Sequence, residues 1–307
     1  MFEMMLTGFP LKTGNAVWPN ELADLPVTTI DWISTDVPTE MYVSGGVTAA
    51  VTASRKLWHY NGLTNKWTDL GAVPARTAVN GTNNTAYVAG NIILHNGDVI
   101  DVYNTTTKVW STKTGPTYGT VYHSNANGGV VYKGNAYFFG TSTSPQSTLL
   151  KKYVLATNTW STEATYNPTV SSGAYMRGVV IGDLAYFFSP SATPSTVITY
   201  NFLTKAFATI VTPYTVASRS AVVVNGTDIF VAPSSPSGSS GYQMDGNRIL
   251  AFNTLTLTYR ELTQLAPPKL PVFSLIANNK LLLYGGTTKL TGGELSPNMQ
   301  VVDLSRL

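Results

Sequence analysis

Aromatic, arginine and histidine side chains recur in the segments of this sequence that are rich in Ser, Thr, Asn and Gly. Nine of them are candidate ligand-binding residues: Tyr118, Tyr122, His123, Tyr166, Tyr175, Arg177, Tyr214, Arg219 and Tyr242. Tyr and Arg offer large, semi-rigid contact surfaces with hydrogen-bonding ends, and a Tyr ring also stacks on a sugar. These residue types predict binding of a protein or a glycan, although a loop tyrosine can also cap a scaffold without binding a ligand.

Residue types that carry catalysis are scattered along the chain. The three histidines, His59, His95 and His123, show no ligand spacing, and the absence of cysteine excludes disulfides, thiolate metal sites and a Cys nucleophile. Acidic residues stand singly or loosely grouped at Asp98, Asp101, Asp183, Asp228, Asp245 and Glu294. A paired acid and base could still assemble in space, but the sequence does not require one. We expect no catalytic residue, no metal site and no cofactor, and we classify the protein as not an enzyme.

The composition favours strands and turns over helices. Apolar residues make up 43% of the 307 residues, while charged residues make up only 11%, against roughly 25% in a typical soluble domain. The net charge of +3 is spread without a Lys/Arg cluster, so we expect no nucleic-acid partner. Residues 1–6 lack a basic start, and no run approaches the ~20 apolar residues of a membrane span. We therefore expect a soluble protein with no signal peptide and no membrane insertion.

An internal repeat decides the predicted fold. Its first column is a pair of aromatics seven positions apart: Tyr60 and Trp67, Tyr103 and Trp110, Tyr153 and Trp160, Tyr200 and Phe207, Phe252 and Tyr259. Asn61, Asn104 and Asn201 follow the first aromatic, and an Asn side chain there can bond its own backbone and start a turn. Each unit is therefore predicted to contain two antiparallel strands joined by a tight turn.

A second column lies upstream in each unit and predicts another strand. It is an apolar stretch with an aromatic near its Gly-containing end, as in residues 42–46, 87–90 and 137–140, with degenerate copies at 186–189 and 230–233 and a restored Gly pair in 282–286. A further apolar strand and turn precede each copy. Four short strands per unit, with a period of about 48 residues, fit a propeller blade.

These columns resemble the kelch repeat, in which a Gly pair ends the second strand, a Tyr lies in the third and a Trp opens the fourth. The resemblance extends from about Trp18 to the C-terminus. The Gly pair is missing in the fourth and fifth units, where Phe207 and Tyr259 replace Trp. The resemblance implies an all-β fold, a six-bladed β-propeller of four-stranded kelch-like blades.

The two ends of the chain share the last blade in this prediction. The last unit supplies three strands, and Val17–Pro26 parallels Lys66–Pro74, the fourth strand of the first blade. The N-terminal strand then completes the last blade and leaves no open sheet edge at the seam. We expect residues 17–307 to form a single propeller domain and residues 1–16 to be a tail or an anchor.

Functional side chains are expected on the face that carries the longest loops. In a four-stranded blade, the connections between strands 2 and 3 and from strand 4 to the next strand 1 share one face. The longest predicted segments on that face are 46–55, 117–123, 166–177, 232–247 and 287–297. The candidate residues are assigned to this face. An Arg at the start of a first strand, such as Arg219, is also a common kelch framework residue.

Enzymatic propellers fit this sequence poorly. Kelch-type copper oxidases need a Tyr–Cys crosslink, which the absence of cysteine excludes, and the repeated Asp boxes of sialidase-type propellers are absent. A bacterial sialic-acid mutarotase shares the six-bladed kelch architecture. A sugar mutarotase or epimerase therefore stays an alternative, on fold analogy alone.

Low charge, no cysteine, polar loops and no signal peptide favour a virion component. We expect a non-enzymatic structural or receptor-binding module, located in the virion in a phage tail, fibre or capsid-associated position. Its expected partners are other virion proteins or a host-surface glycan, and its oligomeric state is imposed by assembly. A cytoplasmic protein-interaction propeller is the other alternative, although such propellers usually accompany a second domain, for which this chain has no room.

Overall fold

The computed structural model is all-β throughout the part of the chain that it describes. That part comprises residues 31–34, 39–44, 55–64, 66–74, 84–96, 99–115, 129–143, 146–166, 177–189, 196–211, 215–235, 248–264, 273–277, 280–284 and 300–304. The regular elements assigned in these ranges are strands.

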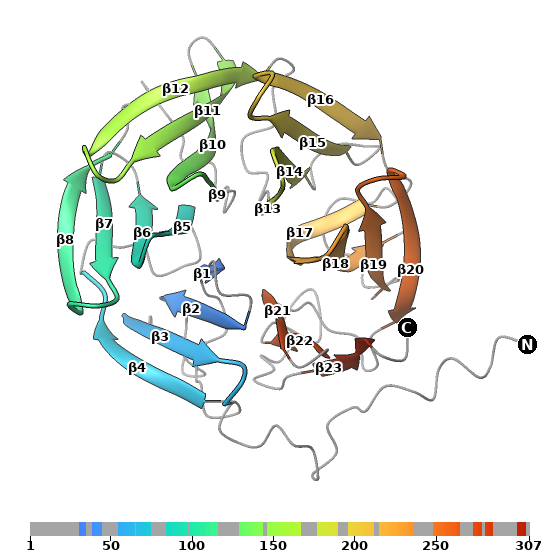
Figure 1. Ribbon diagram of the computed structural model, residues 1–307, viewed down its shortest axis with the longest axis horizontal. Helices are drawn as coiled ribbons and strands as arrows, with labels where there is room; N and C mark the ends of the chain where they lie inside the picture. Colours follow the sequence, from blue (N-terminus) through green and yellow to red (C-terminus); the bar gives the residue numbers. More distant parts are fainter. Residues whose placement is uncertain are drawn as a thin grey trace, which may run out of the picture.

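The strands form six antiparallel sheets arranged around a ring (Figure 1). The first two sheets contain β1 Asp31–Ser34, β2 Glu40–Ser44, β3 Lys56–Asn61 and β4 Lys66–Ala72, then β5 Asn84–Val88, β6 Asn91–Asn96, β7 Val99–Asn104 and β8 Val109–Thr114. The next two contain β9 Val130–Tyr132, β10 Asn135–Thr143, β11 Gln146–Val154 and β12 Thr159–Tyr166, then β13 Arg177–Ile181, β14 Leu184–Ser189, β15 Thr196–Asn201 and β16 Ala206–Val211. The last two contain β17 Thr215–Asn225, β18 Asp228–Ser235, β19 Arg248–Asn253 and β20 Thr258–Gln264, then β21 Phe273–Ala277, β22 Lys280–Tyr284 and β23 Gln300–Asp303.

The fold is a β-propeller whose blades are four-stranded antiparallel sheets, as predicted. Within each sheet the strands follow chain order from the axis of the ring outward, and the innermost strands of neighbouring sheets contact one another from β1 to β21. The prediction of six such blades is corrected, because five sheets have four strands and the sheet β21–β22–β23 has three. The strand assigned to complete that sheet, in residues 17–26, lies outside the described residues. The N-terminal segment 1–16 lies outside them too.

The predicted aromatic pairs are confirmed in all five four-stranded blades. Each pair lies directly opposite across strands 3 and 4, as Tyr60 lies opposite Trp67 and Phe252 opposite Tyr259. The ring centroids of the five pairs are 4.9, 5.0, 4.7, 4.7 and 4.9 Å apart in chain order. Opposed aromatics are among the more stabilising cross-strand pairs. The repeat column therefore fixes the register between the two outer strands of each blade.

The second repeat column is misassigned in the second blade. Tyr87 and Val88 belong to the innermost strand β5, and Ala89 and Gly90 form the turn after it, with φ values of 46° and 75°. The second strand is β6, whose apolar residues run from Ile92 and are fully buried. In this blade an aromatic and a Gly at the predicted spacing therefore end the first strand, because the apolar run after Gly90 forms the second strand, whose apolar side chains are fully buried.

The hydrophobic core lies between neighbouring blades. One cluster joins Phe139 and Leu150 of the third blade to Phe187 and Tyr200 of the fourth, and all four side chains are fully buried. Equivalent clusters join the first blade to the second, the second to the third, the fourth to the fifth, and the fifth to the three-stranded sheet. Each large buried side chain contributes roughly 1.5–3 kcal/mol. The ring therefore gives a rigid scaffold for the connections between its strands.

Two glycines let the innermost strands approach each other closely. A Cβ on Gly129 would lie 2.0 Å from the carbonyl oxygen of Thr85, and a Cβ on Gly178 would lie 2.5 Å from Cγ1 of Val130. A side chain at either position would push the inner strands apart. Glycine is therefore needed at both positions for β5, β9 and β13 to pack near the axis.

Candidate functional site

The strand order gives the propeller two different faces. On one face, which we call the short-turn face, two-residue turns such as 133–134 and 226–227 join strands 1 and 2, and four-residue turns such as 254–257 join strands 3 and 4. The opposite face, which we call the long-loop face, is where β2 ends and β3 begins and where β12 ends and β13 begins. The longest connections lie on this face, as predicted, but those between β6 and β7 (97–98) and between β10 and β11 (144–145) are only two residues long.

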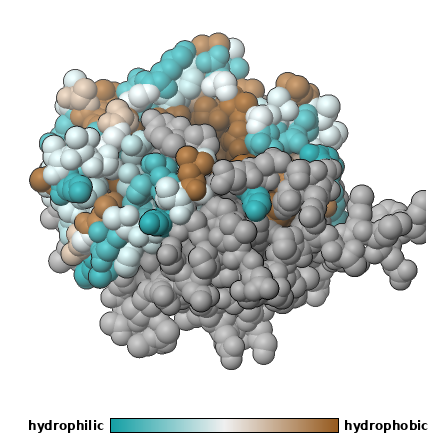
Figure 2. Space-filling model, turned by 60° about the horizontal axis from the view of Figure 1, so that its bottom comes forward, coloured by the Kyte–Doolittle hydropathy of each residue, from teal (hydrophilic) through white to brown (hydrophobic). Residues whose placement is uncertain are grey.

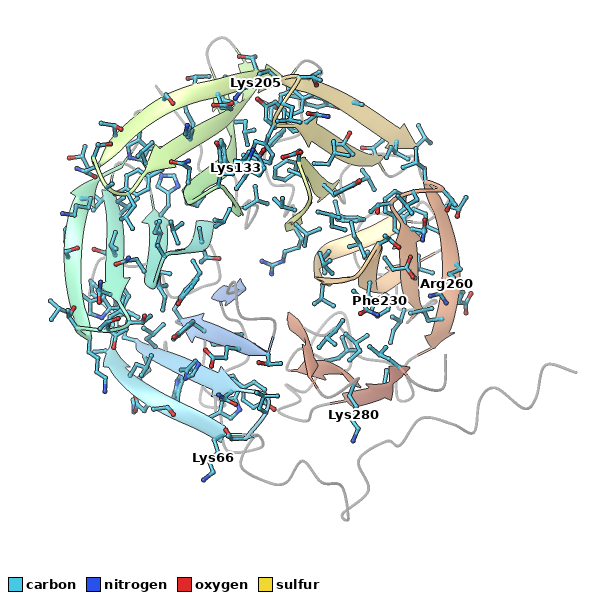
Figure 3. All side chains as sticks on the ribbon, viewed as in Figure 1. Lys66, Lys133, Lys205, Phe230, Arg260 and Lys280 are labelled. Atoms are coloured by element: carbon cyan, nitrogen blue, oxygen red, sulfur yellow. The ribbon has the colours of Figure 1, made fainter. Side chains whose placement is uncertain are left out.

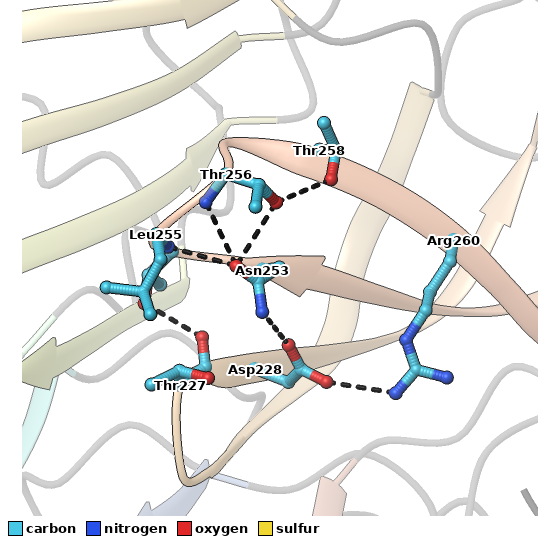
Figure 4. Close-up of polar contacts among 8 residues, drawn as sticks. Thr227, Asp228, Asn253, Leu255, Thr256, Thr258 and Arg260 are labelled. Carbon is cyan, nitrogen blue, oxygen red and sulfur yellow. Dashed lines mark hydrogen bonds and ion pairs between the residues drawn. The ribbon is translucent and has the colours of Figure 1, made fainter.

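An asparagine closes the turn between strands 3 and 4 in four blades, at the three predicted positions and also at Asn253. In the fifth blade, Oδ1 of Asn253 accepts hydrogen bonds from the backbone N–H groups of Leu255 and Thr256 at 3.1 and 3.0 Å (Figure 4). Its Nδ2 donates to Oδ1 of Asp228 at 2.8 Å, and Oδ2 of Asp228 pairs with Arg260 at 2.9 Å. Asn61, Asn104 and Asn201 accept the same two backbone bonds in their blades. These bonds stabilise the turn between strands 3 and 4 in those four blades.

Backbone hydrogen bonds tie the two kinds of short turn to each other. The N–H of Thr105 donates to the carbonyl oxygen of Gly90 at 2.9 Å, and that of Thr254 donates to Thr227 at 2.9 Å. The Thr105 and Thr254 hydroxyls donate to the same carbonyl oxygens at 2.8 Å. In these two blades the turns of the short-turn face are thus bonded to each other.

Tyr166 is a predicted binding residue that the structure places inside the protein. It ends β12, only 6% of its surface is exposed, and its ring contacts those of Phe139 and Phe207. Its hydroxyl hydrogen bonds with Oγ1 of Thr209 at 2.9 Å, in the outer strand of the next blade. Tyr166 therefore joins two blades and offers almost no surface to a ligand in this conformation.

Arg177 is the other candidate whose side chain the structure describes. It begins β13, an innermost strand, and is 4% exposed. Arg219 lies within β17, but its side chain is outside the described part of the structure. Six further candidates lie wholly outside the described residues: Tyr118, Tyr122, His123, Tyr175, Tyr214 and Tyr242. The structure thus brings Tyr166 and Arg177 to the strand ends of the long-loop face, and ligand binding by the nine residues stays a prediction.

A polar and aromatic cluster that the sequence did not indicate lies between the third and fourth blades. The Tyr132 hydroxyl donates to Oδ1 of Asp183 at 2.5 Å, and Nζ of Lys133 lies 3.7 Å from the same oxygen. The Tyr132 ring stacks on Phe202, with centroids 4.0 Å apart. Contacts with Tyr132, and then with Asp183, raise the pKa of Lys133 and so favour its charged form. The cluster could not be found from the sequence, because its residues come together only where the third and fourth blades meet.

Glu163 forms a second link across the same boundary. It accepts a hydrogen bond from the Tyr200 hydroxyl at 3.2 Å and pairs with Lys205, which lies with Lys133 near this boundary in Figure 3. Burial, followed by the neighbouring Tyr137, raises the pKa of Tyr200 to about 12. Tyr200 therefore stays neutral at physiological pH and donates a structural hydrogen bond rather than a catalytic proton.

Five of the described acidic residues lie in ion pairs with Lys, Arg or His. Besides the pairs above, Lys56 Nζ lies 2.5 Å from Oδ2 of Asp69, and Nε2 of His59 lies 3.2 Å from Oε2 of Glu40. His95 is 1% exposed and packs against two aromatic rings of the third blade. Within the described ranges, no group of three or more His, Cys, Asp or Glu residues is placed to hold a metal ion. His59 thus pairs with a carboxylate within the first blade, whereas His95 of the second blade packs against aromatic rings.

The coloured surface is mainly hydrophilic or intermediate in hydropathy, and hydrophobic residues form smaller patches (Figure 2). No helix in the described part of the chain is long and apolar enough to cross a membrane.

No protein-family model matches the sequence, and a search of curated proteins also gave no match. The class that the fold defines is the β-propeller.

Proposed function

We propose that this chain is a non-enzymatic binding module of a virion, in a phage tail, fibre or capsid-associated position. The long-loop face binds a partner protein or a surface glycan, and the rest of the propeller serves as its scaffold. The observation that carries the proposal is the difference between the two faces. Asn253 and its counterparts fix the short turns by hydrogen bonds, so the connections on the opposite face are those able to vary for binding.

Charge pairing supports a binding role over catalysis. Asp183 in the turn before β14, Glu163 within β12 and Asp228 at the start of β18 each lie in an ion pair with Lys or Arg. A general acid–base mechanism needs a carboxyl, His or Tyr that is free to exchange a proton with substrate near neutral pH. Carboxylates held beside Lys or Arg, and a Tyr200 hydroxyl with a pKa of about 12, do not meet that need.

The finer description of the fold belongs to the same proposal: a six-bladed kelch-like ring closed by the N-terminal strand. Among the described residues no strand lies on the outer edge of β23, where the other five sheets carry an aromatic fourth strand. Val302 of β23 pairs with Leu281, at the place where Tyr60 pairs with Met41 in the first blade. Trp18 would therefore lie opposite Val302, as Trp67 lies opposite Tyr60. This strand would pair with the outer edge of β23, as the fourth strand does with the third in the other five sheets.

The virion setting is supported by composition. Charged residues are 11% of the chain and cysteine is absent. A surface built from Ser, Thr, Asn and Gly around a propeller suits contacts with neutral polar partners such as glycans. Loop tyrosines such as Tyr122 and Tyr242 would supply the stacking surface.

A glycan array tests the binding face. We expect the purified protein to bind a restricted set of glycans, and Tyr122→Ala and Tyr242→Ala to weaken that binding at least tenfold. Leu63→Ala is the matched control, because Leu63 is 61% exposed on a short turn of the opposite face. Binding that Leu63→Ala reduces as strongly as the tyrosine variants would contradict a site on the long-loop face. Catalysed exchange of sugar anomers or epimers would replace the binding proposal by the enzyme alternative.

A further inference from the structure

Among the described residues, the fourth strands of the blades have no strand paired with their outer edge at the rim of the ring. Such edges pair readily with another strand, and proteins protect them with charged side chains, proline or β-bulges. Strand β16 lies on the rim (Figure 1), and among the described residues no strand pairs with its outer edge. Its protection can therefore be compared with that of β4, β8, β12 and β20.

The sequence of β16 contains none of the usual protecting features. It comprises Ala206, Phe207, Ala208, Thr209, Ile210 and Val211 and has no charged residue. Its pairing with β15 is regular from end to end. The other four outer strands each contain a charged residue, and β4, β12 and β20 also pair with a shift in register. The β16 edge is thus the least protected of the five fourth strands.

Apolar groups extend this edge at both ends. Leu203, in the turn before β16, is 63% exposed, and Val211, its last residue, is 65% exposed. Ala206, Ala208 and Thr209 are exposed between them. Lys205, just before the strand, pairs with Glu163 of the neighbouring blade, so its charge is already compensated. The rim is therefore uncharged and partly apolar along the whole strand.

We propose that β16 is an interaction surface at which a second copy of this chain pairs antiparallel with the first. A two-fold axis through either Ala208 or Thr209 opposes residues of the same face of the sheet. With Thr209 on the axis, Phe207 lies opposite Val211 and Ala208 opposite Ile210. With Ala208 on the axis, Ala206 lies opposite Ile210 and Phe207 opposite Thr209. Every opposed pair is apolar or contains Thr, so neither register brings charges together.

The second copy fits this edge because the strand is its own complement. Self-pairing places two uncharged strands together, forms backbone hydrogen bonds that are now missing, and covers Val211 with apolar atoms. The contact is limited to one strand and the side chains beside it. An interface of that size is at the small end for protein pairs, and we expect the dimer to exchange with monomer at micromolar concentrations. This inference does not depend on the proposed ligand of the long-loop face.

Cysteine crosslinking of the full chain tests the pairing directly, because the natural sequence contains no cysteine. We expect the residue on the two-fold axis to form a disulfide-linked dimer under mild oxidation when it is replaced by cysteine: Ala208→Cys in one register, Thr209→Cys in the other. Ser111→Cys is the matched control, since Ser111 follows Trp110 in β8 as Ala208 follows Phe207 in β16, and both positions are exposed. We expect at least tenfold less crosslinked dimer from the control.

Sedimentation of the unmodified chain over a range of concentrations gives the second readout. We expect a monomer–dimer equilibrium, which Ala208→Lys shifts at least tenfold toward monomer and Ser111→Lys leaves unchanged. Circular dichroism must show that both variants keep the β-sheet spectrum. A chain that stays monomeric at all concentrations, or no more crosslinking from Ala208→Cys and Thr209→Cys than from Ser111→Cys, would overturn the proposal. A dimer that Ala208→Lys does not weaken would overturn it as well.

Discussion

Replacing Asn253 by alanine removes the side chain that closes the turn between β19 and β20. Its Oδ1 accepts bonds from the N–H of Leu255 and the N–H and hydroxyl of Thr256, and its Nδ2 donates to Asp228. A hydrogen bond of this kind contributes about 0.5–1.5 kcal/mol net, and water partly replaces the bonds at an exposed turn. We expect a loss of roughly 1–2 kcal/mol in the free energy of unfolding.

The third blade offers the reverse experiment. Val154 occupies the place of Asn253 there, and the turn after it ends in Asn158 with φ of 52°, close to the 57° of Leu257 in the fifth blade. The backbone is therefore already suited to an asparagine at position 154. We expect Val154→Asn to stabilise the protein by about 0.5–1 kcal/mol, since it supplies an acceptor for two backbone N–H groups.

Urea unfolding followed by tryptophan fluorescence measures both changes. Asn225→Ala is the control for Asn253→Ala, because Asn225 is an exposed residue at the other turn of the same sheet and should change stability by less than ~0.5 kcal/mol. If Asn253→Ala leaves the midpoint at the wild-type value, or if Val154→Asn destabilises the protein by 1 kcal/mol or more, the reasoning about these turns is wrong.

Three further predictions concern tyrosine, an ion pair and ring closure. Tyr200→Phe loses the hydrogen bond to the Glu163 carboxylate and should lower the free energy of unfolding by about 1–2 kcal/mol in the same urea assay. The Tyr103 hydroxyl has no hydrogen-bond partner among the described residues, so Tyr103→Phe should be neutral or stabilising. The hydrogen bond from Lys56 lowers the pKa of Asp69, although burial opposes this shift. The pair therefore stabilises the fold above the ordinary carboxyl pKa, and this stabilisation is lost as the pH falls. NMR titration should show a higher Asp69 pKa in Lys56→Met. Deleting residues 1–26 should lower the thermal midpoint strongly, and an unchanged midpoint would contradict closure by the N-terminal strand.

Tyr200 also gives a prediction for alkaline pH. Its raised pKa of about 12 means that the folded protein holds this proton more tightly than the unfolded chain, whose tyrosines titrate near 10. Its contribution to stability is complete below the unfolded pKa and is lost as the pH rises through the folded value. The tyrosinate absorbance that develops above pH 10 should therefore be smaller in Tyr200→Phe than in the wild type, by the contribution of one tyrosine. A variant that loses absorbance only near pH 10 would show that the pKa of Tyr200 is not raised.

The repeat made much of the fold predictable from sequence. An aromatic pair seven positions apart, with Asn after the first aromatic, specifies a hairpin whose register and turn follow from local chemistry, and Tyr60–Trp67 and Asn61 show both features. The second column was a weaker guide, because an aromatic before a Gly can end either of the two inner strands. Tyr87 is an example, because it lies in the innermost strand β5 and the apolar run after Gly90 forms the second strand β6.

The side-chain contacts between blades could not be predicted in the same way. Tyr132 and Asp183 are distant in sequence and meet only because the ring places two turns together. Tyr166 had the composition and position of a loop residue, yet its ring entered the boundary between blades and its hydroxyl found Thr209. The absence of charge from β16 became significant only when the topology placed that strand on the rim.

Mass spectrometry of purified virus particles and of the soluble lysate from the same infection tests the proposed function most directly. The proposal predicts that this chain is recovered with the particles at a constant copy number relative to known structural proteins, and that it stays with them through further purification. Recovery only as free protein in the soluble lysate would contradict a virion role.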